Sequence, residues 1–177
     1  MNALALRTPL GNTEAHQGAA AKQALSIVCF SGEWDKLFAA FTIANGALAM
    51  GKDVHVFITF WATAAFDAPQ GSKPSLMERV RRWFLRPGPD AAPLSKLNFF
   101  GFGRALVSMF MKKHGVESLP TLIDEAKQLG VHLYYCDMSM RLLGYQPKNF
   151  PLGERDTLCG VATFLRVTEK CQQTLFI

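Results

Sequence analysis

The four cysteines are the residues of this sequence best suited to chemistry, because a thiolate is both a strong nucleophile and a metal ligand. They stand at positions 29, 136, 159 and 171, and no two of them have the CxxC spacing of a dithiol redox motif or a zinc knuckle. The four histidines are scattered along the chain as well. We therefore expect no metal site and no cofactor, and we expect the chemistry to depend on a single reduced cysteine.

Cys136 is the cysteine that we predict to be catalytic. It closes a predicted strand over residues 131–136, and the chain then turns into a short predicted helix over residues 138–143. Unpaired N–H groups and the helix dipole at such a point favour thiolate over thiol, whereas the carboxylate of Asp137 opposes a second negative charge. On position alone, a nucleophilic thiol and a small buried hydrophobic residue are equally good interpretations.

Cys29 lies near the end of the first predicted strand, over residues 24–30. Strands one and three are neighbours in the predicted fold, so Cys29 could lie beside Cys136 and act as a second thiol. A buried, inert core thiol is the favoured interpretation, because strand cysteines are usually of that kind. A Cys29 side chain on the opposite face of the sheet would exclude direct pairing with Cys136.

Apolar runs that alternate with amphipathic segments predict the elements that position these cysteines. Strands are predicted over residues 24–30, 53–60, 131–136 and 174–177, and helices over residues 35–50, 119–129, 138–143 and 156–170. This alternation predicts an α/β fold of flavodoxin-like type, an open parallel sheet with helices on both faces. Residues 23–177 are expected to form a single domain, preceded by a flexible tail over residues 1–22.

Ligands of such a sheet bind beyond the carboxyl ends of its strands, where three predicted loops meet. These loops and strand ends provide the expected pocket or supporting residues: Cys29, Ser31, Gly32, Trp61, Asp137 and Ser139. No glycine-rich phosphate motif follows the first strand. Nucleotide or flavin binding at the strand ends is therefore a weaker alternative.

The positive charge of the chain is concentrated in one segment. The 177 residues carry a formal net charge of +5, but residues 73–113 alone hold nine basic and two acidic residues, which gives +7. We interpret residues 70–113 as a basic helical insertion, with helices over residues 75–85 and 99–113. It could pack on a sister subunit, dock an acidic partner protein or contact an anionic membrane surface. Nucleic-acid binding is not expected, because no recognised motif accompanies the charge.

The residues at the end of the third predicted strand form a motif, Cys136-Asp137-Met138-Ser139-Met140 followed by Leu143-Gly144. It resembles the cysteine motif of the DsrE/DsrF-like family, and more closely the branch often labelled "peroxiredoxin family" or DsrE-type sulfur carrier. Further similar segments follow in order along the chain: Ser31-Gly32, Asp35-Lys36, Ala44-Asn45-Gly46, Phe57-Ile58-Thr59-Phe60-Trp61, Leu94-Ser95-Lys96-Leu97-Asn98, Gly160-Val161-Ala162-Thr163 and Thr174-Leu175-Phe176-Ile177. Cys159 stands where the family commonly has glycine.

The resemblance implies a cytoplasmic, sulfurtransferase-type protein with a DsrE-like fold. Cys136 would hold sulfane sulfur as a persulfide and relay it to partner proteins such as rhodanese-like or TusA-like carriers. Proteins of this family are typically oligomers, often trimer-based, so the resemblance also implies a homo-oligomer. The alternative is a non-catalytic subunit, or an adaptor at the membrane surface that attaches through the basic segment, with a purely structural cysteine.

Overall fold

A sheet of five parallel strands forms the centre of the computed structural model, which describes residues 23–68, 76–95, 102–150 and 152–177. The strands are β1 (Ala24–Cys29), β2 (Asp53–Ile58), β3 (His132–Cys136), β4 (Thr157–Cys159) and β5 (Gln173–Phe176). Their order across the sheet is β4-β3-β2-β1-β5, and each neighbouring pair runs parallel. The predicted open parallel sheet is confirmed.

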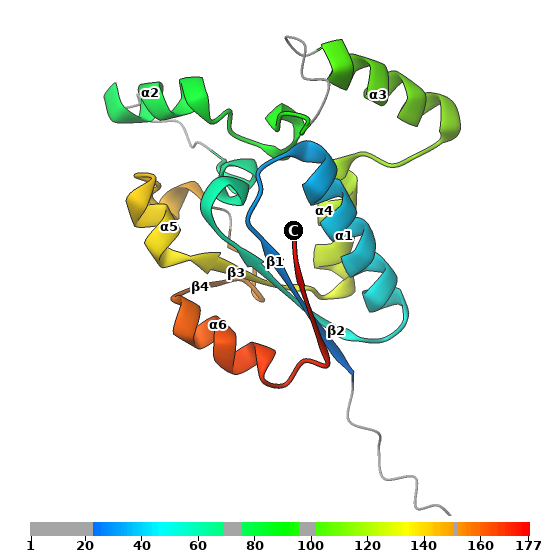
Figure 1. Ribbon diagram of the computed structural model, residues 1–177, viewed down its shortest axis with the longest axis vertical. Helices are drawn as coiled ribbons and strands as arrows, with labels where there is room; N and C mark the ends of the chain where they lie inside the picture. The colour runs from blue at the N-terminus through cyan, green and yellow to red at the C-terminus, as the bar shows by residue number, and fades with distance from the viewer. Residues whose placement is uncertain (1–22, 69–75, 96–101, 151) are drawn as a thin grey trace, which may run out of the picture.

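Helices cover both faces of this sheet (Figure 1). The helices α1 (Trp34–Ala49) and α4 (Leu119–Leu129) lie on one face, and α6 (Val161–Thr168) lies on the other. Two further elements leave the strand ends directly, η1 (Phe60–Phe66) after β2 and α5 (Asp137–Leu142) after β3. The remaining elements are α2 (Leu76–Phe84), η2 (Pro89–Ala91), α3 (Phe102–His114) and η3 (Pro147–Asn149). Among the described residues, no helix combines the length and apolar character that crossing a membrane requires.

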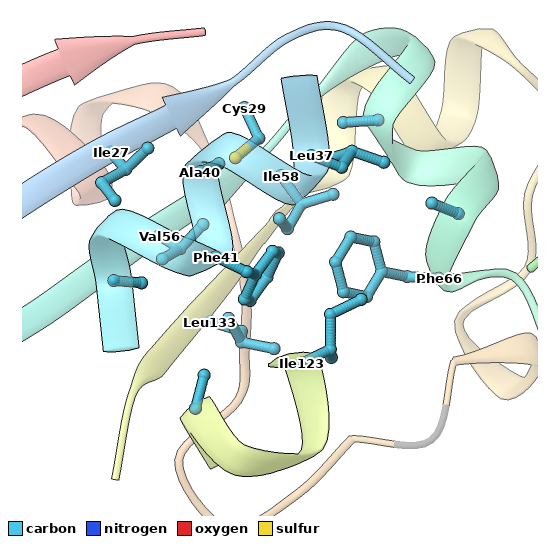
Figure 2. Packing of buried hydrophobic residues seen from close by; sticks show 14 of the residues in the cluster. Ile27, Cys29, Leu37, Ala40, Phe41, Val56, Ile58, Phe66, Ile123 and Leu133 are labelled. Atoms are coloured by element: carbon cyan, nitrogen blue, oxygen red, sulfur yellow. The ribbon is translucent and has the colours of Figure 1, made fainter. Parts of the chain in front are cut away.

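The main core lies between the sheet and the helices α1 and α4, and Figure 2 shows its centre. The inner strands supply β-branched and leucine side chains, among them the fully buried Ile27, Ile58 and Leu133. Such apolar runs are typical of parallel strands, because both of their faces are covered. Leu37 and Phe41 of α1, four residues apart, point into this cluster from the same side of the helix.

A buried amide ties the two helices of this face together. The Nδ2 atom of Asn45 in α1 donates to the carbonyl oxygen of Leu122 at 3.0 Å and to Oε2 of Glu125 at 2.9 Å. Both partners belong to α4. Because a buried amide must find hydrogen-bond partners, Asn45 fixes how α1 and α4 lie against each other, which explains a polar residue in an otherwise apolar helix.

Two of our predictions about the sheet are wrong. The helix predicted over residues 156–170 begins instead with strand β4, and α6 starts only at Val161. Three residues are too few to show strand alternation in a sequence, so the pairing with β3 is what makes β4 a strand. The strand order also contradicts the expected neighbours, because β2 lies between β1 and β3.

The basic segment forms helices close to the predicted ranges. The helices α2 and α3 correspond to the predictions for residues 75–85 and 99–113, and in Figure 1 both lie beyond the carboxyl ends of β1 and β2. Residues 69–75 and 96–101 of this segment, like the predicted tail over residues 1–22, are outside the described residues. The predicted character of that tail therefore stays a prediction.

Candidate functional site

The loop after β1 is held against the backbone that follows β2. A Cβ atom on Gly32 would lie 2.4 Å from the carbonyl oxygen of Trp61, so only glycine fits at this position. Ser31 shapes the same loop, because its Oγ donates to Oε2 of Glu33 at 3.0 Å and accepts from the Glu33 N–H at 3.2 Å. These contacts place Ser31, Gly32 and Trp61 next to one another, and Trp61 is 45% exposed.

A hydrogen bond between two buried hydroxyl groups joins the end of β2 to α5. The Oγ1 atom of Thr59 lies 2.8 Å from Oγ of Ser139, and neither side chain is open to solvent. The backbone N–H of Thr59 also donates to the carbonyl oxygen of Cys29 at 3.0 Å. These contacts link the ends of three neighbouring elements, and they fix the first turn of α5 relative to the sheet.

Cys136 is the residue from which α5 begins, and its side chain is fully buried. It belongs to a small apolar cluster with Phe57 of β2, Cys159 of β4 and Phe164 of α6, separate from the main core. The rings of Phe57 and Phe164 are stacked, with centroids 4.5 Å apart and planes 14° from parallel. The Cys136 thiol therefore lies beneath α6, in surroundings made almost entirely of carbon and sulfur.

The carboxylate of Asp137 is paired with a guanidinium group on the surface of α5. Nε of Arg141 donates to Oδ1 of Asp137 at 3.0 Å, and Nη2 lies 2.6 Å from Oδ2. An exposed pair one helical turn apart adds little to stability. Its consequence here is electrostatic, because a cation compensates the negative charge that the sequence places next to Cys136.

Cys29 lies on the opposite face of the sheet from Cys136, within the main core of Figure 2. Its partner across the sheet is Ile58 of β2, and β1 does not touch β3. Burial raises the pKa of the Cys29 thiol to about 12, so it stays protonated near neutral pH. The prediction that Cys29 could lie beside Cys136 is wrong, and the inert core thiol is the arrangement found.

Cys159 is the cysteine that lies beside Cys136. The two residues are partners in the register of β3 and β4, and both belong to the cluster beneath α6. Burial raises the pKa of the Cys159 thiol, and the neighbouring Cys136 raises it further. In the sequence, Cys159 is noticeable only as a departure from the family pattern. Its place beside Cys136 follows from the pairing of β3 with β4, which the sequence does not show.

The sheet also brings together two of the four histidines that are scattered along the sequence. His55 of β2 and His132 of β3 are register partners, and their rings stack with centroids 5.0 Å apart. Nδ1 of His55 lies 3.2 Å from the Tyr134 hydroxyl, and Nη1 of Arg155 lies 3.3 Å from Nε2 of His132. Burial, and then the neighbouring His132, lower the pKa of His55. Within the described part of the chain, no cluster of three or more metal-ligating side chains forms.

A cavity of about 360 Å³ lies on the other side of the sheet from the Cys136 thiol, between η1, η2 and α4. Its lining includes Phe66, Tyr135 and Ile123, together with two carboxylates and one ammonium group, those of Asp67, Asp124 and Lys127. Phosphate recognition uses convergent N–H groups and cations. This mixed lining gives the nucleotide or flavin alternative no support.

Comparison with known proteins places this geometry in a family. The model of the DsrE/DsrF/DrsH-like family matches residues 21–176. The chain is 41% identical over 154 residues to the uncharacterised protein YrkE of Bacillus subtilis (strain 168), covering 86% of this chain and 95% of YrkE. It is 25% identical over 161 residues to the sulfur carrier protein DsrE2 of Allochromatium vinosum, covering 86% of this chain and 97% of DsrE2.

Among solved structures, the YchN protein of E. coli is similar to this chain with a TM-score of 0.47 and 11% sequence identity. The match covers 88% of this chain and 99% of YchN. The family match spans the whole sheet, from β1 to the end of β5, and includes Cys136 and Cys159. The chain therefore belongs to the DsrE/DsrF/DrsH-like family.

Proposed function

We propose that this protein is a sulfur carrier that holds sulfane sulfur as a persulfide on Cys136 and relays it to partner proteins. The observation that carries the proposal is the position of Cys136, at the end of a central strand and the start of a helix, in a cluster from which water is excluded. Family membership and the similarity to the sulfur carrier DsrE2 support it.

Persulfide transfer needs no cofactor and no net oxidation. The Cys136 thiolate attacks the outer sulfur of a persulfide on the donor, the S–S bond of the donor breaks, and the donor leaves as a thiolate. The reverse sequence passes the sulfur to an acceptor thiol. The acceptors proposed here are small carriers of the rhodanese-like or TusA-like kind, as the family resemblance implies.

The apolar cluster suits storage of such a group. A persulfide is readily oxidised and reacts with free thiols, and both reactions need access from solvent. Phe57 and Phe164 enclose the Cys136 thiol, so a bound sulfur would be shielded between transfers. Loading must then involve either local opening of α6 or a neighbouring group that reaches the surface.

The location of the bound sulfur tests this proposal directly. Incubation with glutathione persulfide, alkylation of the persulfides and peptide mapping should find the added sulfur on the peptide that contains Cys136. Cys171 is the internal control, because it is only half-buried and lies between α6 and β5, outside the cluster. Sulfur found mainly on Cys171 would mean that the donor reacts by exposure alone, and it would refute the proposal.

A second proposal concerns assembly, and it rests on the apolar stripe of α2. Four large side chains at helical spacing are exposed there: Leu76, Val80, Trp83 and Phe84. Trp83 is 77% exposed and Phe84 is 71% exposed. We propose that this stripe packs on a second copy of the chain, because a helix of nine residues offers little apolar surface for lasting attachment to a membrane.

Substitution within the stripe should change the oligomeric state. Trp83→Glu places a charge at the centre of the proposed contact, so light scattering after gel filtration should show a smaller species than the wild-type assembly. Leu142→Glu on α5 is the matched control, because Leu142 is also exposed but lies on a different helix. An unchanged assembly, combined with loss of co-sedimentation with phosphatidylserine vesicles, would assign the stripe to a membrane surface instead.

A further inference from the structure

The two thiols beneath α6 are close enough to react with each other. Cys136 and Cys159 are register partners on adjacent parallel strands, and both side chains enter the same apolar cluster. Neighbouring strands lie about 4.8 Å apart, which falls within the Cα separation of roughly 4.4–6.8 Å that permits two cysteine sulfurs to bond. A sulfur atom carried on either residue is thus within reach of the other.

The two residues differ in their access to solvent. Cys136 has no exposed surface, whereas 8% of Cys159 is exposed. The difference follows from the sheet, because β3 is covered by β2 and β4, while β4 is an edge strand of only three residues. The exposed Gly160 follows Cys159 directly and is the N-cap residue of α6. A donor at this edge therefore meets Cys159 before it can reach Cys136.

We propose that Cys159 is a relay thiol, which takes up sulfane sulfur at the edge of the sheet and exchanges it with Cys136. This inference rests on the proposed function and names a second residue for it. In the exchange, the Cys136 thiolate attacks the outer sulfur of the Cys159 persulfide. The S–S bond on Cys159 breaks, Cys136 becomes the persulfide, and Cys159 leaves as a thiolate, so atoms, charge and oxidation state balance.

The exchange requires only one thiolate in the pair at any time. Burial raises the pKa of Cys159, and proximity to Cys136 raises it further, so two thiolates side by side are disfavoured. The exchange never requires two, because one negative charge passes from the attacking sulfur to the leaving sulfur. Attack on the inner sulfur would instead give a Cys136–Cys159 disulfide and release hydrogen sulfide, which makes the two routes distinguishable.

The rate at which Cys136 acquires sulfur tests the relay. With glutathione persulfide as the probe, loading of Cys136 in the Cys159→Ser variant should be slower than in wild type by at least about tenfold, because the intramolecular delivery step is lost. Cys171→Ser removes a thiol outside the cluster and should load at the wild-type rate. Cys159→Ala, which leaves no hydroxyl in the apolar cluster, should reproduce the slow loading and so exclude an effect of the buried serine hydroxyl.

Three results would overturn the relay, and each has a separate meaning. Equal loading rates for wild type and Cys159→Ser would show that sulfur reaches Cys136 directly, with the proposed function intact. Stoichiometric hydrogen sulfide, together with a disulfide that links the two peptides, would make Cys159 a resolving thiol rather than a relay. Absence of sulfur from Cys136 in the wild-type protein would refute the proposed function, and the relay with it.

Discussion

Replacing Cys136 with serine is expected to abolish stable sulfur loading and transfer. A serine hydroxyl cannot form a persulfide, and at neutral pH it does not ionise to a comparable nucleophile. After incubation with glutathione persulfide and removal of the excess, intact-mass measurement should show one added sulfur on the wild-type protein and none on the variant. Sulfur that Cys159 takes up should return to the glutathione thiolate released in the uptake step, because Cys136 is no longer present to accept it.

The controls for this prediction separate chemistry from folding. Cys29→Ser and Cys171→Ser each remove one thiol and leave the cluster beneath α6 complete, so both should retain the adduct. A buried, unpaired hydroxyl destabilises a protein by about 1–3 kcal/mol, so thermal unfolding of Cys136→Ser must confirm that the variant is folded. An adduct that persists unchanged in folded Cys136→Ser would refute the assignment of Cys136 as the carrier.

The inner strands β1 and β3 could be predicted from the sequence because their residue types are typical of buried strands. Residues 24–30 and 131–136 are short apolar runs rich in β-branched or aromatic side chains, and they correspond to β1 and β3. β4 carries no such pattern, since its three residues are strand only through pairing with β3. Short edge strands of this kind depend on tertiary contacts, and local sequence patterns do not report those contacts.

The candidate site could be predicted in part for the same reason. The end of a strand at Cys136 can be predicted from the local sequence. The residue beside Cys136 on the next strand depends instead on the order of the strands in the sheet. The expected order placed Cys29 there, and the observed order places Cys159. The direction of the Asp137 carboxylate could not be predicted from the sequence either, because it depends on the two contacts with Arg141 in the folded helix.

Strand order also decides what a cysteine can do. Cys29 and Cys136 both end parallel strands at the same edge of the sheet, yet they face opposite layers. Cys29 is covered by the long helix α1 and the main core, which leaves it inert. Cys136 is covered by α6, a helix of eight residues at the margin of the domain. Access to the Cys136 thiol is therefore governed by how firmly α6 is held.

Phe164→Ala is expected to weaken that hold and expose Cys136. Phe164 is 3% exposed, and its ring stacks on Phe57 over the two thiols. Truncation of a buried phenylalanine to alanine typically destabilises a protein by about 3–5 kcal/mol, and the short α6 places this site near the lower limit, about 3 kcal/mol. Denaturant unfolding should show this loss, and alkylation of Cys136 should accelerate by at least about tenfold, because local opening becomes easier.

The neighbouring residue on the same helix supplies the matched control. Leu165 is 54% exposed, so Leu165→Ala should change the free energy of unfolding by no more than about 0.5 kcal/mol and leave Cys136 alkylation unchanged. Phe164→Leu keeps most of the apolar volume and should lie between wild type and Phe164→Ala in both measurements. If folded Phe164→Ala loses stability while Cys136 alkylation stays slow, α6 is not the cover of the thiol. Sulfur would then have to reach Cys136 through Cys159, at the edge of the sheet, without movement of α6.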